Sequence, residues 1–173
     1  MDRYVSGTEY QEQDLFYLNE LWNSWEHHTR FSHTDKAAAL KGINESLREA
    51  SACIRKAGWI IITLGSAFQY YLKEDTRPVS NNHRAPGQWF EKRLLSSELI
   101  RERLQQSMDG ILQVNPKSRF LFTISPVRHV RDGVVDNNRS KARLIEAVHM
   151  LCESNDQAYY FPAYELVIDI LRD

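Results

Sequence analysis

The 173 residues of this chain suffice for one domain with its own core, and 22 Lys plus Arg against 23 Asp plus Glu leave it nearly neutral. No stretch gathers five or six like charges, so the sequence lacks the basic footprint of a nucleic-acid-binding or membrane-binding protein. The longest apolar run, residues 59–64, is far shorter than a membrane span, and the N-terminus lacks a signal-peptide core. We expect a cytoplasmic domain over residues 1–173 whose partners are small molecules or proteins, not nucleic acid or a membrane.

The first predicted unit is a helix followed by a strand. Between Thr34 and Lys56 the apolar residues recur at steps of three and four, and Thr34-Asp35 suits a helix N-cap. Residues 59–64 then form a continuous, mostly β-branched run, which is typical of a strand covered on both faces. We predict an amphipathic helix that leads into a central parallel strand.

The same order occurs twice more. Ser96-Ser97 cap a helix that Asn115-Pro116 stop, and a buried strand is expected at 120–124. A helix over 140–152 leads to a short strand at 159–161, after which a helical segment runs from Pro162 through Leu171. Residues 67–80 are expected to form a hairpin excursion between the first two units.

Three helix-then-strand units predict an α/β fold with a parallel sheet, right-handed crossovers and helices on both faces. In such sheets, ligands bind beyond the carboxyl ends of the strands. Gly65 and Ser66 follow the first strand and Ser125 follows the second, so we take these residues as site candidates. Ser66 as a nucleophile would need a base that no neighbouring residue supplies, and a tight turn that contributes to a site is the alternative.

Polar loops supply the other candidates. Asn82 and His83 could orient a polar substrate, or belong to an ordinary hydrophilic loop. His129 follows the second strand and either lines the site or is a structural histidine. Asn138 and Lys141 lie where a helix is expected to begin, which indicates either helix capping or an anion-binding helix N-terminus.

Two other features have modest explanations. Three histidines fall within residues 27–33, yet they lack the spacing of a zinc helix, so a segment that covers the substrate is favoured over a metal site. Residues 1–33 are accordingly a candidate lid or insertion. Cys53 and Cys152 are expected to be free, small, buried residues. No cofactor motif is present, and we expect neither a cofactor nor a metal.

At these clusters the chain resembles the GSCFA family, a branch of the SGNH-hydrolase-like folds. The matching segments, in order, are Thr63-Leu64-Gly65-Ser66-Ala67, Asn82-His83-Arg84-x-Pro86, Ser125-Pro126-Val127-x-His129, Asn138-x-Ser140-Lys141-Ala142 and Tyr160-Phe161-Pro162-x-Tyr164-Glu165. The second segment lacks a cysteine of the family pattern, and Glu165 joins the candidate site through the last.

The resemblance implies a three-layer α/β/α, flavodoxin-like sheet that serves an esterase or acyltransferase acting on a polar, carbohydrate-linked ester. It also implies that the Gly-Ser-Cys-Phe-Ala block with the nucleophile lies before Met1, and that the Asp-x-x-His block lies after Asp173. Ser66 belongs to a different block of the family pattern from the one that carries the nucleophile. We therefore expect no catalytic residue in this chain, and a non-catalytic binding module for a small molecule or carbohydrate is the alternative.

The missing first block has a structural consequence. Without the strand that it would contribute, the strand at 59–64 would lie at an edge of the sheet. This strand has no charge and no proline, so self-association through it is expected unless residues 2–16 cover it.

Overall fold

A computed structural model describes residues 2–128 and 133–171 of the protein. The chain forms two compact units whose segments alternate along the sequence. Unit 1 consists of residues 1–53 and 69–93, and unit 2 consists of residues 54–68 and 94–173. The single domain over 1–173 stays a prediction.

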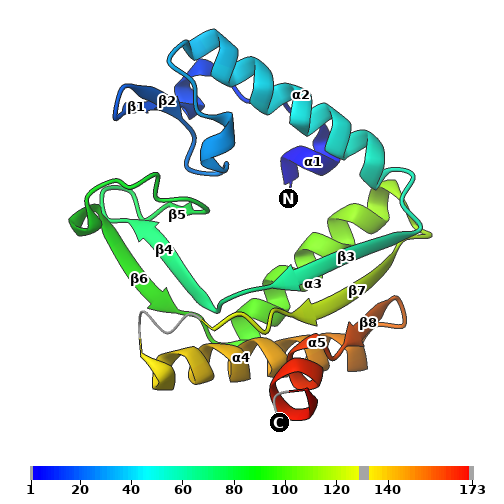
Figure 1. Ribbon diagram of the computed structural model, residues 1–173. Helices are drawn as coiled ribbons and strands as arrows, with labels where there is room; N and C mark the ends of the chain where they lie inside the picture. The colour runs from blue at the N-terminus through cyan, green and yellow to red at the C-terminus, as the bar shows by residue number, and fades with distance from the viewer. Residues whose placement is uncertain (1, 129–132, 172–173) are drawn as a thin grey trace. The chain divides into compact units, whose positions relative to one another are not determined.

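Unit 2 is built on a parallel sheet (Figure 1). Its strands β3 (Trp59–Leu64), β7 (Arg119–Ile124) and β8 (Ala158–Phe161) lie in the order β3-β7-β8. Helix α3 (Ser97–Val114) connects the first two strands, and helix α4 (Val134–Glu153) connects the last two. The α/β class with a parallel sheet is therefore confirmed.

The ends of α3 follow from its sequence. Ser96 is the N-cap, since its Oγ accepts a hydrogen bond of 3.3 Å from the Leu99 N–H. At the other end, the Asn115 amide donates to the carbonyl oxygens of Ile54 and Ala57, at 2.8 and 3.0 Å. Asn115, which was predicted to end α3, thus also binds the segment that precedes β3.

Helix α4 begins earlier than predicted. It starts at Val134 rather than Ser140, after Gly133, whose φ of 95° suits glycine. Asn138 and Lys141 therefore lie within the helix rather than at its first turn, which corrects the expectation of an N-terminal cap or anion site at these residues. The polar character of 136–141 hid the helix because it interrupts the apolar pattern.

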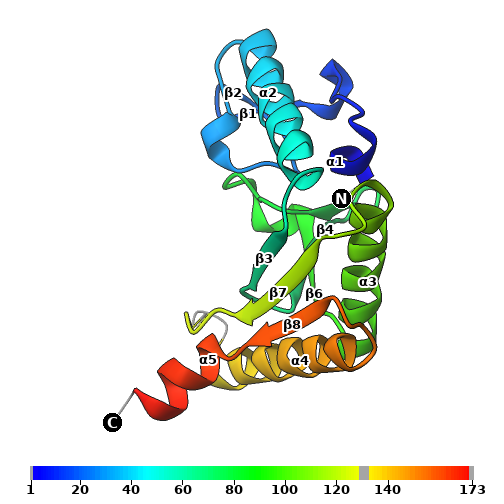
Figure 2. The same ribbon diagram turned by 90° about the vertical axis from the view of Figure 1, so that its right-hand side faces the viewer.

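The core of unit 2 lies between the sheet and its two helices, which pack against each other (Figure 2). The β7 side chains of Phe120, Phe122 and Ile124 are fully buried. They lie with the buried helix residues Met108, Ile111, Ala147, Val148 and Leu151. Each of these side chains larger than alanine contributes about 1.5–3 kcal/mol of transfer free energy.

Strand β3 differs from the sequence-based expectation. Trp59 is 49% exposed and Ile61 is 67% exposed, and β3 pairs only with β7 among the described strands. Tyr159, which lies level with Ile61 across the sheet, is also exposed. The prediction of a central strand covered on both faces is therefore wrong, and the edge position is confirmed. The error arose because apolar residues occupy both faces of β3, so alternation gives no signal.

After β8, the chain continues as predicted into helical structure. Pro162 precedes the short helix α5 (Ala163–Glu165), which runs into a π-helical turn, η5 (Leu166–Ile170). Helix α5 directly follows the last strand and contacts β7 of the sheet.

Unit 1 contains helix α2 (Lys36–Ile54) and the N-terminal segment that packs on it. The Asp35 carboxylate accepts a 2.7 Å hydrogen bond from the Ala38 N–H, as expected of a helix start. Tyr10 and Leu15 of the N-terminal segment form a buried cluster with α2 residues Ala39, Ile43 and Leu47. The N-terminal segment is therefore part of the unit 1 core.

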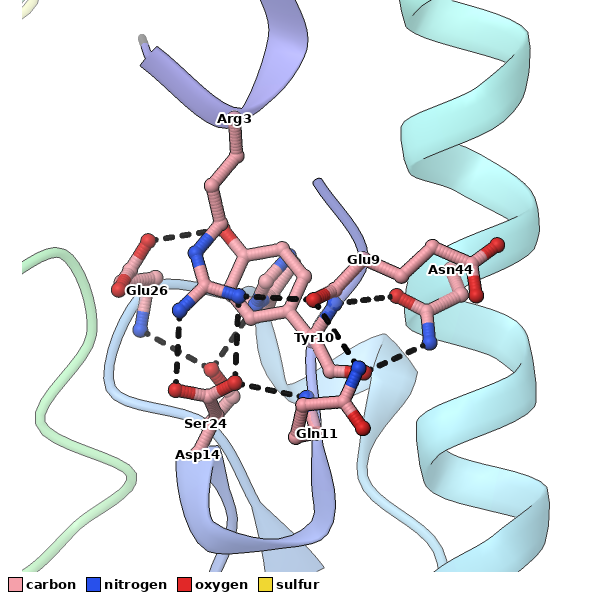
Figure 3. A network of polar contacts seen from close by, with 9 residues as sticks. Arg3, Glu9, Tyr10, Gln11, Asp14, Ser24, Glu26 and Asn44 are labelled. Atoms are coloured by element: carbon pink, nitrogen blue, oxygen red, sulfur yellow. Dashed lines mark hydrogen bonds and ion pairs between the residues drawn. The ribbon is translucent and has the colours of Figure 1, made fainter. Parts of the chain in front are cut away.

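A polar network fastens this segment, which includes α1 (Asp2–Ser6) and the turn η1 (Glu12–Asp14) (Figure 3). The Asn44 side chain pairs with both backbone groups of Tyr10, at 2.8 and 3.0 Å. Arg3 binds both carboxylate oxygens of Asp14, at 3.2 and 3.0 Å. Such bidentate pairs fix geometry as well as contributing energy.

The predicted hairpin excursion is confirmed as the start of an antiparallel sheet. Strand β4 (Phe68–Leu72) lies between β5 (Pro78–Val79) and β6 (Phe90–Leu94), with Tyr70 opposite Val79. A short helical turn, η3 (Gly87–Trp89), precedes β6.

A second hairpin pairs β1 (Phe16–Leu18) with β2 (Leu21–Asn23) through Asn19 and Glu20, whose positive φ values are typical of a two-residue turn. The turn η2 (Thr29–Phe31) follows. The Phe16 and Trp25 rings stack at 3.6 Å between centroids, and Trp25 is buried with Leu72, Val79 and Phe90. Residues 1–33 thus contribute to the core of unit 1, and their role as a lid stays a prediction.

None of the helices in the described residues combines the length and apolar character needed to cross a membrane. Both cysteines are free, as expected. Cys152 is partly buried, but Cys53 is exposed, contrary to the prediction that both are buried.

Candidate functional site

Lys141 joins the carboxyl ends of β3 and β7. Its Nζ donates hydrogen bonds of 2.7 Å to the carbonyl oxygens of Gly65 and Ser125, and the residue is 2% exposed. Burial lowers the pKa of Lys141 below its ordinary value. The ammonium group of Lys141 therefore holds two strand ends together. The sequence alone could not distinguish this role from that of a surface anion ligand.

Ser140, its neighbour, fixes the turn that follows β3. The Ser140 Oγ accepts a 2.7 Å hydrogen bond from the Ala67 N–H and lies 3.3 Å from the Ser66 Oγ. Sequence reasoning did not select Ser140, although the Ser-Lys pair is part of the matching segment. We call Gly65, Ser66, Ser125, Ser140 and Lys141 the strand-end cluster.

Ser66 is exposed at the end of β3, but it has no activating partner among the described residues. Its Oγ contacts the Ser140 Oγ and accepts a 3.1 Å hydrogen bond from the Phe68 N–H. Neither group is a base, whereas a serine nucleophile requires one within hydrogen-bonding distance.

The other candidates of unit 2 lie apart from these bonds. Asn138 is exposed on α4, and its Oδ1 accepts a 3.3 Å hydrogen bond from Asn137. Glu165 accepts hydrogen bonds from the Tyr160 hydroxyl through both carboxylate oxygens, each at 2.8 Å. Burial and this pairing raise the pKa of Tyr160. His129 lies outside the described residues.

In unit 1, His83 is held in a tight turn. His83 and Arg84 both have positive φ values, of 48° and 58°, and the Asn81 Oδ1 accepts a 2.9 Å hydrogen bond from the His83 N–H. The turn closes when the Ala85 N–H donates to the Asn82 carbonyl, at 2.8 Å. We call residues 81–84 the His83 turn.

The His83 ring is buried, and its orientation is defined. Nε2 lies 2.7 Å from the Ser24 carbonyl oxygen, which can only accept, so Nε2 carries the proton. The other nitrogen, Nδ1, is buried and has no hydrogen-bond partner in the described residues. Burial lowers the pKa of His83, which favours the neutral ring.

A serine–histidine pair does occur in unit 1. The Ser24 Oγ lies 2.9 Å from the Nδ1 of His27, and the two residues are 3% and 7% exposed. Burial lowers the pKa of His27. Because a substrate cannot reach Ser24 in this arrangement, the pair is structural.

The His83 turn also borders an open cavity of about 570 Å³. His83 and Arg84 line it, together with His28 from the preceding segment. The sequence singles out His83 as a site residue, whereas Arg84 and His28 fall in candidate segments without being selected individually. Among the described residues, no group of three or more His, Cys, Asp or Glu side chains is arranged to hold a metal ion.

The turn after β3, the Ser-Lys pair and the His83 turn all fall in the segments that carried the family resemblance. No curated protein and no solved structure matches this chain. The model of the GSCFA family matches residues 1–173, so the chain belongs to the GSCFA family.

Proposed function

We propose that this chain is the substrate-holding scaffold of an SGNH-like esterase or acyltransferase that acts on a polar, carbohydrate-linked ester. The strand-end cluster is the observation that supports this role. It lies at the carboxyl ends of parallel strands, where α/β proteins bind ligands, and its small turn at Gly65–Ala67 is held by Ser140 and Lys141. The Ala67 N–H is used by Ser140, but the Gly65 and Ser66 N–H groups of this fixed turn can face an ester without reorganising.

The scaffold does not carry out acyl transfer by itself in this proposal. That chemistry needs a nucleophile, a base and an orienting group together, and removing them costs several orders of magnitude in rate. Ser66 has neither a histidine nor a carboxylate in hydrogen-bonding contact among the described residues. We therefore expect binding without turnover.

A turnover assay tests this expectation. The purified chain should hydrolyse p-nitrophenyl acetate no faster than the buffer does, and Ser66→Ala should leave any residual rate unchanged. Ser107→Ala, a half-buried serine of α3 whose hydroxyl donates to the Arg103 carbonyl, is the matched control. A loss of tenfold or more in Ser66→Ala alone would identify Ser66 as a nucleophile and contradict the proposal.

The second candidate is a binding module for a small molecule or carbohydrate, which the cavity beside the His83 turn favours. Chemical-shift perturbation with an acetylated disaccharide, and with the same disaccharide lacking acetyl groups, separates the two. The ester scaffold predicts shifts at the Gly65–Ala67 amides with the acetylated probe only. Equal shifts with both probes, centred on the His83 turn, would favour the binding module.

A further inference from the structure

The cavity beside the His83 turn is formed within unit 1 by three local structures. These are the β1–β2 hairpin, the segment around η2 and the His83 turn itself, which meet around about 570 Å³. This volume lies in the range of small-molecule sites. The polar lining residues that matter here are Asn19, His28, Thr29, Asn81, His83 and Arg84.

The ionisable side chains of this lining are all basic. The lining includes an arginine and two histidines but no carboxylate. Arg84 is exposed and makes no ion pair with a described residue. A guanidinium that has no partner within residues 2–128 and 133–171, at the border of a cavity lined by no acidic side chain, is suited to an anion.

His28 supplies a second donor. Its Nδ1 accepts a 3.1 Å hydrogen bond from the Arg30 N–H, so in the neutral ring the proton lies on Nε2. His28 is exposed, and its Nε2–H has no hydrogen-bond partner in the part of the chain that the structure describes, which leaves it for a ligand. Arg84 and His28 thus provide N–H donors from two separate segments of the chain.

The wall between these donors is fixed by hydrogen bonds. The Asn81 Oδ1 holds the His83 N–H, and the Asn81 amide nitrogen reaches the Thr29 hydroxyl at 3.5 Å. The Trp25 carbonyl also accepts from the Asn81 N–H, at 3.2 Å. The His83 turn is therefore tied to the segment that carries His28, which sets both donors on one frame.

The backbone of the His83 turn is strained at two successive positions. Two successive non-glycine residues, His83 and Arg84, adopt the left-handed conformation, at a cost of about 1–2 kcal/mol each. The His83 Nδ1 is also buried without a partner. Strain and an unsatisfied polar atom in one turn are typical of functional sites, and here both accompany the unpaired Arg84.

We propose that this cavity binds the anionic oxygen group, a carboxylate or a phosphate, of a small polar ligand through Arg84 and His28. The site is independent of the function proposed for the strand-end cluster. The His83 turn positions Arg84, and Asn81 and Thr29 offer further polar contacts. Carboxylate and phosphate present the same oxygen acceptors to a guanidinium, so the structure assigns their shared chemistry.

Isothermal titration of the full chain with inorganic phosphate, citrate and neutral glucose tests the site. We expect saturable binding of phosphate, citrate or both, and none of glucose. Arg84→Gln should weaken binding at least tenfold. Arg77→Gln, an exposed arginine of the same unit that lines a different cavity, should leave it unchanged.

A second variant and a second measurement guard against a mere folding defect. His28→Gln changes a donor outside the strained turn and should weaken binding severalfold, with an unfolding midpoint close to that of the parent. In spectra of the parent, ligand should shift the His28 ring signals. The His28 ring signals report on the cavity in unit 1, whereas the amide signals of Gly65–Ala67 report on the proposed ester scaffold. Either proposal can therefore fail while the other holds.

Three outcomes would overturn the site. The first is no saturable binding of phosphate or citrate up to about 50 mM, where even millimolar affinity is visible. The second is an equal loss of affinity in Arg84→Gln and Arg77→Gln. The third is binding that leaves the His28 ring signals unchanged.

Discussion

The strand-end cluster and the His83 turn use their polar residues in opposite ways. Lys141 and Ser140 are buried, and their polar atoms bond to backbone groups of the fold itself. The His83 turn keeps a buried nitrogen without a partner, a strained backbone and an exposed arginine. Groups bonded within the fold stabilise it, whereas an exposed group that lacks a partner among the described residues, such as the Arg84 guanidinium, can bind a ligand. Two polar segments of one family pattern thus differ: the Ser-Lys pair is bonded within the fold, and we propose that the His83 turn serves a ligand.

The largest effect should follow from removing the structural lysine. Lys141→Met leaves the Gly65 and Ser125 carbonyl oxygens without their donor, and we expect a loss of about 3 kcal/mol in the free energy of unfolding. Urea unfolding measures it. The exposed Lys117→Met should change stability by less than about 0.5 kcal/mol. Equal effects of the two variants would mean that the Lys141 bonds contribute nothing to the fold.

The next effect concerns the open edge of unit 2. We propose that copies of the chain associate through β3, because it is an uncharged edge strand and Ile61 is 67% exposed. Ile61→Lys should raise the dissociation constant at least tenfold, measured by light scattering across a dilution series. Val135→Lys, which changes an equally exposed apolar residue on α4, should leave it unaffected. A parent chain that is monomeric at every concentration, with strongly protected Ile60–Thr63 amides, would refute this association.

A smaller effect, of opposite sign, is expected in the His83 turn. Arg84→Gly removes the left-handed strain at φ 58°, and we expect a gain of about 0.5–1 kcal/mol in stability together with loss of anion binding. Arg103→Gly, in the regular helix α3, should instead cost about 1 kcal/mol. Thermal unfolding compares the two. A loss of stability in Arg84→Gly would show that the turn is not strained, and the contrast between the two regions would disappear.

The parallel sheet could be predicted from the sequence because the helical periodicity of apolar residues, the helix caps and the apolar strand runs all indicated the same fold. Ser96 and Asp35 capped their helices as expected, and the segment after Gly65 turned where predicted. Exposure of β3 could not be predicted, because a run such as 59–64 is apolar at every position whether or not its second face is covered.

For the candidate site, the sequence located the polar turns but not the use of each group. Lys141 looked like an anion ligand, yet its bonds to the Gly65 and Ser125 carbonyls depend on the packing of α4 beside two strand ends. The loop that carries Arg84 could be read either as a substrate-orienting loop or as an ordinary hydrophilic one. Whether Arg84 has an ion-pair partner depends on which residues other segments of the chain bring near it. The local sequence does not contain that information.

The smallest effect expected is a gradual loss of stability in mild acid, which tests the comparison through the buried histidines of unit 1. Burial lowers the pKa of His27 and of His83 below the ordinary value of 6.5. Between the folded pKa and 6.5 the unfolded chain binds more protons than the folded chain, so stability is full above pH 6.5 and falls as the pH drops. Only a fraction of unfolded histidines gain a proton between pH 7 and pH 6, which keeps the change small. Urea unfolding at these two pH values should show a shallower pH dependence for His27→Gln and His83→Gln, whatever stability each variant loses at pH 7. The exposed His33→Gln should keep the dependence of the parent. If all three variants keep it, His27 and His83 bind protons equally in the folded and unfolded chains, and burial does not hold these rings neutral.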